Sequence, residues 1–400
     1  MNCLDFQGLE AIVNWRKFQI FPWVTALALV LSTVLTACAL PQVNAQERIF
    51  LGLSVEFLDE YELPKRPFQD TPVGGLSGIT YDRQRDRFYV ISDDRGHYAP
   101  ARFYTLKLNL DSNSSDPPKI ASVDIESVTF LKGEDGNPYP IGEIDAEGIA
   151  FASPNSVYIA SEGIARKGLA PFIHEINLET GQFVRDITLP KRYIPDTAEN
   201  QTQGIQDNFG LESLTLNPRG FGDATVDPYR LFTATEAPLV QDLDELDAEL
   251  PPKNRLLHYL ISDGPPILIS ENLYTLDESI RWSLYKGLPE LLALEQGGHL
   301  LSLERHFGFL GFGAKLFEIQ TGSATDTSRI ASLKGELKKV EPIKKRLLLN
   351  LQDLGIELDN LEGMTLGPRF SDGSQSLILI SDDNFNPDQV NQILLFRLKL

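Results

Sequence analysis

Short apolar stretches, each bounded by turn residues, repeat along the chain from residue 76 onward. In five of them a serine or glutamate at the second position is followed by mostly apolar residues. They read LSGITY from Leu76, AEGIAF from Ala146, LESLTL from Leu211, PELLAL from Pro289 and LEGMTL from Leu361. Counted from the second residue of each, the spacings are 70, 65, 78 and 72 residues. A repeat of this length predicts a fold built from similar supersecondary units.

A turn and a second apolar stretch follow each of the five segments. These second stretches cover residues 88–92, 157–161, 230–235, 300–303 and 377–381. In every repeat the next residue is acidic: Asp93, Glu162, Glu236, Glu304 and Asp382. Ionised carboxylates seldom end a buried strand without a partner, so a five-fold occurrence indicates a common role for these acids.

Two further apolar stretches complete most repeats, for example 103–110 with 120–130. Four short antiparallel strands per repeat, in units that cannot bury their faces alone, predict an all-β fold of the β-propeller type. The spacings favour five blades over the alternative of six. The last repeat has one further strand, 393–398, so we expect the N-terminal strand 49–58 to complete it and close the ring. The most helical stretch, 239–250, is polar and predicts a loop.

The start of the chain has a different composition. Arg16 and Lys17 precede a long uncharged and mostly apolar run, which is typical of an export signal. The sequence LTAC resembles a lipoprotein box that would lipidate Cys38, whereas VNA before Gln46 is an ordinary peptidase site. An uncleaved membrane anchor is a third alternative. We therefore expect an exported protein that is periplasmic, secreted or a membrane-anchored lipoprotein.

The cysteine positions and the net charge limit the ligands and partners expected for the rest of the chain. We expect a signal at 1–45 and one domain at 46–400, and both cysteines, Cys3 and Cys38, lie in the signal. The domain therefore has no disulfide and no cysteine metal site. The formal net charge of −20 at pH 7 argues against nucleic acid and is compatible with binding of cations. We expect a monomer that meets the membrane only through its leader or a lipid anchor.

The acids of the repeats should gather at one end of the propeller. In an antiparallel hairpin the start of the first strand lies beside the end of the second, and the first strands line the channel. Carboxylates crowded at the channel mouth repel one another, and oxygen ligands from several directions suit Ca²⁺. The predicted calcium ligands are Ser77, Glu147, Glu212, Glu290, Glu362, Asp94, Asp382 and Asp383. The alternative is that these groups bond to backbone N–H groups or are solvated.

The loops after the second strands open on the same face and carry cations and amides. The predicted substrate-binding residues are Arg95, His97, Arg102, Arg166, Arg305, His306 and Asn384. Basic groups beside an acidic metal site suit a phosphate ester, whose oxygens arginine can clamp. In this scheme Arg95 and Arg305 stabilise negative charge, and Asp93 or Glu162 accepts a proton. Ordinary pairing of arginines with carboxylates within the loops is the alternative.

These motifs resemble known families. The strand starts, together with SDDRG at 92–96 and NLEGM and ISDDNF near the C-terminus, resemble the phytase-like propeller domain, whose members are described as having esterase-like activity. Ser77, Glu147, Glu212 and Glu362 are also similar to the calcium-activated nucleotidases (apyrases), which are five-bladed and bind Ca²⁺ on the channel axis through such residues. Glu290 in the fourth repeat departs from that pattern. Phytase propellers proper have six blades.

The resulting hypothesis is an exported, Ca²⁺-dependent phosphoric ester hydrolase that acts on a small phosphorylated or ester substrate at the channel mouth. A non-catalytic propeller that binds a ligand or partner, with Ca²⁺ as a structural pin, is one alternative. A carboxylic ester or lactone hydrolase on the same metal is the other. The five histidines lack an H-x-x-x-H pattern, so zinc is not expected.

Overall fold

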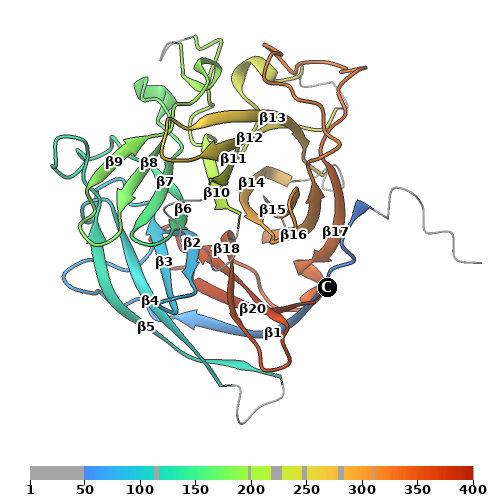
Figure 1. The fold of residues 1–400 in the computed structure, drawn as a ribbon. Coiled ribbons are helices and arrows are strands. Elements are labelled where there is room, and N and C mark those ends of the chain that lie inside the picture. Colours follow the sequence, from blue (N-terminus) through green and yellow to red (C-terminus); the bar gives the residue numbers. More distant parts are fainter. Residues whose placement is uncertain are drawn as a thin grey trace, which may run out of the picture. The chain divides into compact units, whose positions relative to one another are not determined.

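The computed structural model describes residues 49–111, 117–196, 200–217, 228–245, 250–277, 283–309 and 311–399. Contacts divide the chain into Met1–Ile49 and Phe50–Leu400, and the second unit holds five four-stranded antiparallel sheets around a central axis (Figure 1). The prediction of an all-β, five-bladed propeller is confirmed. The described residues contain no α-helix, and none that is long and apolar enough to cross a membrane. The predicted leader lies outside them, so export stays a prediction.

Each blade is a meander whose first strand is innermost. The first blade comprises β2 (Leu76–Asp82), β3 (Arg87–Ser92), β4 (Arg102–Asp111) and β5 (Lys119–Phe130), and the second comprises β6 (Ala146–Ala152), β7 (Ser156–Ser161), β8 (Phe172–Asn177) and β9 (Phe183–Asp186). The third comprises β10 (Leu211–Leu216), β11 (Tyr229–Thr235), β12 (Lys253–Ile261) and β13 (Ile267–Thr275), and the fourth comprises β14 (Ser283–Ala293), β15 (His299–Gly308), β16 (Gly311–Gln320) and β17 (Lys344–Asn350). The fifth comprises β18 (Asn360–Arg369), β19 (Gln375–Asp382), β20 (Asn391–Lys399) and β1 (Ser54–Leu63). The predicted loop at 239–250 contains a short 3₁₀ turn, Val240–Asp242.

Closure of the ring follows the prediction, with a shift of the closing strand. β1 pairs antiparallel with β20, from Ser54 opposite Lys399 to Leu63 opposite Asn391. The sequence pattern predicted this strand at 49–58, which includes residues that do not pair with β20. Of these, Leu53 packs instead into the apolar core between the fourth and fifth blades.

Apolar side chains fill the spaces between neighbouring blades. Five clusters of buried residues are present, and each joins two adjacent blades. For example, Ile91 of β3 and Ile159 of β7 share the cluster between the first and second blades. Every blade therefore buries its faces against two others, and this is why one repeat could not fold alone.

Four inner hairpins share one irregularity at the channel mouth. Ser77, Glu147, Glu212 and Glu362 each occupy a bulge in the first strand, between two residues that are paired with the second strand. A bulged residue is unpaired and its side chain can be redirected. The bulges therefore place the same position of four blades at the same depth around the axis.

The fourth blade is offset by one residue from the predicted alignment. Gly287 pairs with Arg305 and Glu290 with Leu303, so the bulge holds Leu288 and Pro289. Pro289 thus takes the place predicted for Glu290, and Arg305 takes the place predicted for Glu304. Because successive side chains of a strand point to opposite faces, this offset turns both glutamates away from their predicted positions.

We predict that Gly148→Ala destabilises the propeller where its inner strands meet. A Cβ atom at Gly148 would lie 2.5 Å from the backbone oxygen of Glu212 and 2.8 Å from the Cβ of Leu214. The backbone cannot yield cheaply there, so we expect a loss of about 1–3 kcal/mol and a melting temperature lower by roughly 2–8 °C. Gly297→Ala is the matched control, since no atom lies within 4 Å of its added carbon. Equal melting temperatures for the two variants in calorimetry would contradict this account.

Candidate metal centre

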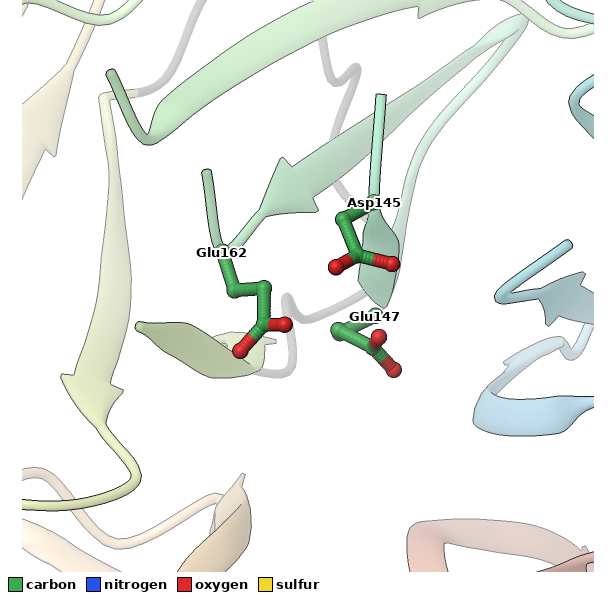
Figure 2. A group of neighbouring side chains, drawn as sticks. All are labelled: Asp145, Glu147 and Glu162. Atoms are coloured by element: carbon green, nitrogen blue, oxygen red, sulfur yellow. The ribbon is translucent and has the colours of Figure 1, made fainter. Parts of the chain in front are cut away.

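Three carboxylates of the second blade meet at the channel mouth. Asp145 precedes β6, Glu147 occupies its bulge and Glu162 follows β7. One oxygen of each lies within 4.8 Å of the others, and Figure 2 shows the three side chains next to one another. Sequence analysis included Glu147 and Glu162 but missed Asp145. Its position two residues before Glu147, on the same side of an extended strand, was the available signal.

We call Asp145, Glu147 and Glu162 the carboxylate triad. Hydrogen bonds with the backbone fix two of its members. The Glu162 N–H donates to the Asp145 carbonyl oxygen at 3.0 Å, and the Gly210 N–H donates to Glu162 Oε2 at 3.0 Å. Asp145 and Glu162 are each 1 % exposed. The triad is therefore held by the hairpin of its own blade and by the start of the next one.

Burial makes the negative charge of this region costly. Burial, followed by the charges of Asp145 and Asp382, raises the pKa of Glu147 to about 8. Burial likewise raises the pKa of Asp382 to about 7, and raises the pKa values of Asp93 and Glu162 well above their usual range. These groups lose much of this penalty when a cation is near.

The donor set of the triad fits a hard metal ion. Its ligands are oxygens only, and the separation of its atoms is compatible with metal–oxygen distances of roughly 2.3–2.6 Å. Among the described residues, Asp145 Oδ1 and the nearby Asp93 Oδ1 are buried without a hydrogen-bond partner. Arg95 is the cation in contact, with Nη2 3.4 Å from Glu162 Oε1 and close to Asp145. The triad can thus bind a metal ion.

Arg305 neutralises the other half of the channel mouth. Its Nη2 lies 2.8 Å from Glu236 Oε1 and 3.6 Å from Glu212 Oε1, and its Nη1 contacts Glu362. It also donates to the Tyr285 hydroxyl at 2.9 Å. Although burial opposes it, the charges of Glu236 and Glu212 hold the pKa of Arg305 above its usual value. Two predicted calcium ligands, Glu212 and Glu362, are therefore paired with a side chain.

The one-residue offset of the fourth blade corrects the predicted ring. Glu290 Oε1 accepts the N–H groups of Leu214 at 3.1 Å and Leu291 at 2.9 Å, so this side chain joins inner strands below the mouth. Glu304 accepts from the Tyr274 hydroxyl at 2.6 Å and pairs with Lys345 at 2.5 Å. Both were predicted to lie at the mouth because the repeats were assumed to have the same register in all five blades.

A cavity of about 330 Å³ opens at the mouth. The predicted site residues that line it are Asp93, Asp94, Arg95, His97, Glu147, Glu212, Arg305, Glu362, Asp382 and Asn384. Five further lining residues were not predicted from the sequence, namely Tyr98, Asn208, Tyr285, Asn360 and Phe385. Tyr285 and Asn360 are bonded to Arg305, and Asn208 is bonded to Arg95. These three therefore belong to the site through their arginine partners rather than through a repeated motif.

The remaining predicted residues do not line the cavity. They are Ser77, Arg102, Glu162, Arg166, Glu290, His306 and Asp383. Ser77 Oγ donates to the Glu147 carbonyl oxygen at 3.1 Å, and Arg102 is fully buried with Nη1 2.7 Å from Asp94 Oδ2. Asp383 Oδ1 accepts the Gly75 N–H at 2.9 Å. These three are engaged in contacts that hold the strands and loops around the site.

Arg166 and His306 lie apart for other reasons. Arg166 pairs at 3.2 Å with Asp207, and its side chain is mostly exposed. His306 belongs to β15 and is buried, and burial lowers the pKa of its imidazole, so it stays neutral at physiological pH. Neither lines the cavity that Arg95 lines.

The family model for phytase-like proteins, described as esterase-like activity of phytase, matches residues 71–385. The chain belongs to the phytase-like family. The predicted resemblance to this family is confirmed, and it covers the propeller from just before β2 to the end of the ISDDNF motif. The match brings the channel mouth within a family that is named for ester hydrolysis.

Solved structures similar to this phytase-like propeller are distant. The catalytic domain of the Coprinopsis cinerea GH62 α-L-arabinofuranosidase is 11% identical with a TM-score of 0.42, over 86% of this chain and 96% of that one. A putative oxidoreductase (glucose dehydrogenase) from Thermus thermophilus is 13% identical with a TM-score of 0.34, over 87% and 100%. No protein among those with curated functions matches significantly. The chemistry of the phytase-like propeller is therefore argued from its own residues.

We predict that Arg305→Met destabilises the phytase-like propeller at neutral pH when divalent cations are chelated. The substitution leaves Glu212, Glu236 and Glu362 buried without their cation, so we expect a loss of about 3–5 kcal/mol in urea unfolding. Lower pH should reduce the loss, because protonation removes the unpaired charges. Arg166→Met is the control, and its exposed pair should contribute less than about 1 kcal/mol. Similar small losses for both variants would show that Arg305 is not the counter-ion of this half.

Proposed function

We propose that this phytase-like propeller is an exported, Ca²⁺-dependent hydrolase of phosphoric esters, with its active site in the cavity at the channel mouth. The observation that carries the proposal is the carboxylate triad, in which one oxygen of each residue lies within 4.8 Å of the others. Beside it is Asp93, whose buried Oδ1 has no hydrogen-bond partner among the described residues. The family description supports ester hydrolysis in general. The phosphoric ester substrate, the calcium ion and export go beyond that description and are our proposal.

Asp145, Glu147 and Glu162 would hold the calcium ion, and water would complete its shell. Ca²⁺ accepts six to eight oxygen ligands in flexible geometry, whereas Mg²⁺ requires a stricter octahedron. A triad that comes from one blade, with Asp93 and Asp382 nearby, suits Ca²⁺, whose coordination geometry is the more flexible of the two. When bound, such an ion polarises the phosphoryl group and makes a coordinated water more acidic.

Asp93 is the best-placed proton acceptor. Its Oδ1 is buried and lacks a hydrogen-bond partner among the described residues, and burial raises the pKa of the carboxyl. A raised pKa makes a carboxylate a better base near neutral pH. Glu162, the other predicted acceptor, already receives the Gly210 N–H at 3.0 Å. We therefore assign the proton to Asp93 and leave Glu162 with the triad.

Arg95 is the more exposed of the two arginines that line the cavity. Its Nη2 donates to Asn208 Oδ1 at 2.7 Å, and 22 % of its side chain is exposed at the cavity wall. A phosphate oxygen placed there would gain a charge-assisted hydrogen bond. Arg305 is occupied by three carboxylates, so its contribution is to reduce the negative charge that an anionic substrate meets.

A carboxylic ester hydrolase on the same residues is the second candidate. The description of the family as esterase-like favours it. The same ion would polarise a carbonyl group, and Asp93 would again accept the proton. The two candidates differ in the charge of the substrate, and an assay separates them directly.

We predict that Glu147→Gln changes stability in opposite directions with and without calcium. In wild type, Ca²⁺ at a hundredfold excess over Kd should stabilise the fold by about 2.7 kcal/mol, and chelation should lower the melting temperature by a few degrees. The variant lacks one ligand charge, so this calcium gain should shrink. Without calcium the variant should be more stable than wild type above about pH 5, because the raised pKa of Glu147 makes its ionisation costly in the folded state.

Glu357→Gln is the control for this measurement, since Glu357 is exposed. Its melting temperature should follow wild type with and without chelator. A wild type indifferent to chelator, together with a stabilised Glu147→Gln, would exclude a metal at the triad.

We predict that the purified domain hydrolyses phosphate esters in Ca²⁺ and not with chelator, in a panel of phosphate monoesters, diesters, nucleotides and aryl carboxylic esters. Asp93→Asn should lower kcat by roughly 10²–10⁴-fold, as expected for loss of a general base, while the calcium-induced gain in melting temperature persists. Turnover of carboxylic esters alone would favour the second candidate. Intact calcium binding without any turnover would indicate a non-catalytic propeller.

A further inference from the structure

Three aromatic residues, Tyr98, Tyr285 and Phe385, line an otherwise polar cavity. Tyr98 and Tyr285 both line it, and each is backed by a second ring. The Tyr98 and Phe385 ring centroids are 4.6 Å apart, and those of Tyr285 and Phe209 are 5.5 Å apart. Tyr98 is 63 % exposed, so it contributes little to the core.

The exposed ring of Tyr98 is nevertheless held in place from its backbone. The buried carboxylate of Asp94 accepts the N–H groups of His97 at 2.8 Å, Tyr98 at 3.2 Å and Ala99 at 2.9 Å. Arg102, fully buried, completes this arrangement with Nη1 2.7 Å from Asp94 Oδ2. The buried Asp94–Arg102 ion pair therefore holds three consecutive backbone N–H groups, and the loop that carries the exposed Tyr98 ring is fixed in position.

Phe385, which backs Tyr98, adopts a backbone conformation that is rare for its type. Asn384 and Phe385 have φ values of +47° and +50°, and such conformations cost energy in residues with bulky side chains. Asp383 Oδ1 accepts the Phe385 N–H at 3.1 Å, and the ring lies against Gly75, where an added Cβ would be 2.6 Å from it. Strain that is enforced at a cavity wall indicates that the position of the ring matters there.

We propose that the substrate carries an aromatic ring next to its phosphate and that this ring stacks on Tyr98. The inference deepens the proposed function and rests on it. Tyr98 and Phe385 form a rigid apolar wall, and Arg95 and Glu147, the triad member that lines the same cavity, supply its polar end. An aryl phosphate matches both, because its ring and its phosphate are joined by a single ester oxygen.

The reaction then balances without a further reactant. The oxygen of water forms a bond to phosphorus, and the bond between phosphorus and the aryl oxygen breaks. Asp93 takes one proton from the water and returns it to the departing aryl oxygen. The products are a phenol and inorganic phosphate.

Calorimetric titration of the folded domain in Ca²⁺ with phenylphosphonate and methylphosphonate tests this inference. Both probes carry a phosphonate that cannot be hydrolysed, and they differ in the ring. We expect phenylphosphonate to bind roughly tenfold more tightly, as stacking on an aromatic side chain contributes at this scale. Tyr98→Ala should reduce the ratio to less than about twofold without changing the affinity for methylphosphonate, whereas Tyr98→Phe should preserve the ratio.

Leu347→Ala is the control, since Leu347 is 49 % exposed on β17, the outer strand of the fourth blade. Its affinities should equal those of wild type. Equal binding of the two probes, or a ratio that survives Tyr98→Ala, would overturn the aromatic substrate and leave the phosphoric ester hydrolase standing. No binding of either probe would overturn the phosphate site itself, and the inference with it.

Discussion

The organisation of the channel mouth depends on the neutralisation of buried negative charge. Each of the four regular hairpins delivers acids or a serine to the same depth around one axis, and burial there makes ionised carboxylates expensive. The chain meets this constraint in two ways. Arg305 pairs with the acids of one half, whereas the triad of Asp145, Glu147 and Glu162 has an excess of negative charge that a metal ion can offset. The division between the halves is what distinguishes one position of a nearly symmetric ring as the candidate metal site.

That division originates in the register of a single hairpin. In the fourth blade, Arg305 stands opposite Gly287 and so occupies the position that an acid has in the other blades. A shift of one residue in strand pairing moves each side chain to the other face of the sheet, and the overall fold does not need to change. The repeat thus supplies five similar positions, and one local offset converts one of them from an anion to a cation.

The sequence alone was sufficient for the fold and for part of the site. Apolar stretches at regular spacing predicted five blades and the closing pair of β1 and β20. The register of the fourth blade could not be predicted, because Leu291 and Leu292 are both apolar and the alternation that distinguishes the two faces is absent. Tyr98 lies in a loop outside the repeat, so no periodicity marks it. Asp94 and Arg102 were predicted to bind calcium and substrate, because a sequence does not reveal which charged groups pair, and their ion pair instead shapes that loop.

Closure of the ring by β1 and β20 also joins the two ends of the domain. The paired residues Ser54 and Lys399 are almost the whole domain apart in sequence, whereas the hairpins within the first four blades join close neighbours. Contacts of such long separation form late, since the entropy of closing the loop must be overcome before the ladder contributes. Until then β20 lacks its outer neighbour, and the fifth blade has three strands. The ladder between the two ends of the domain therefore closes the ring that carries the acids of the channel mouth, and its loss would detach β1 from the fifth blade.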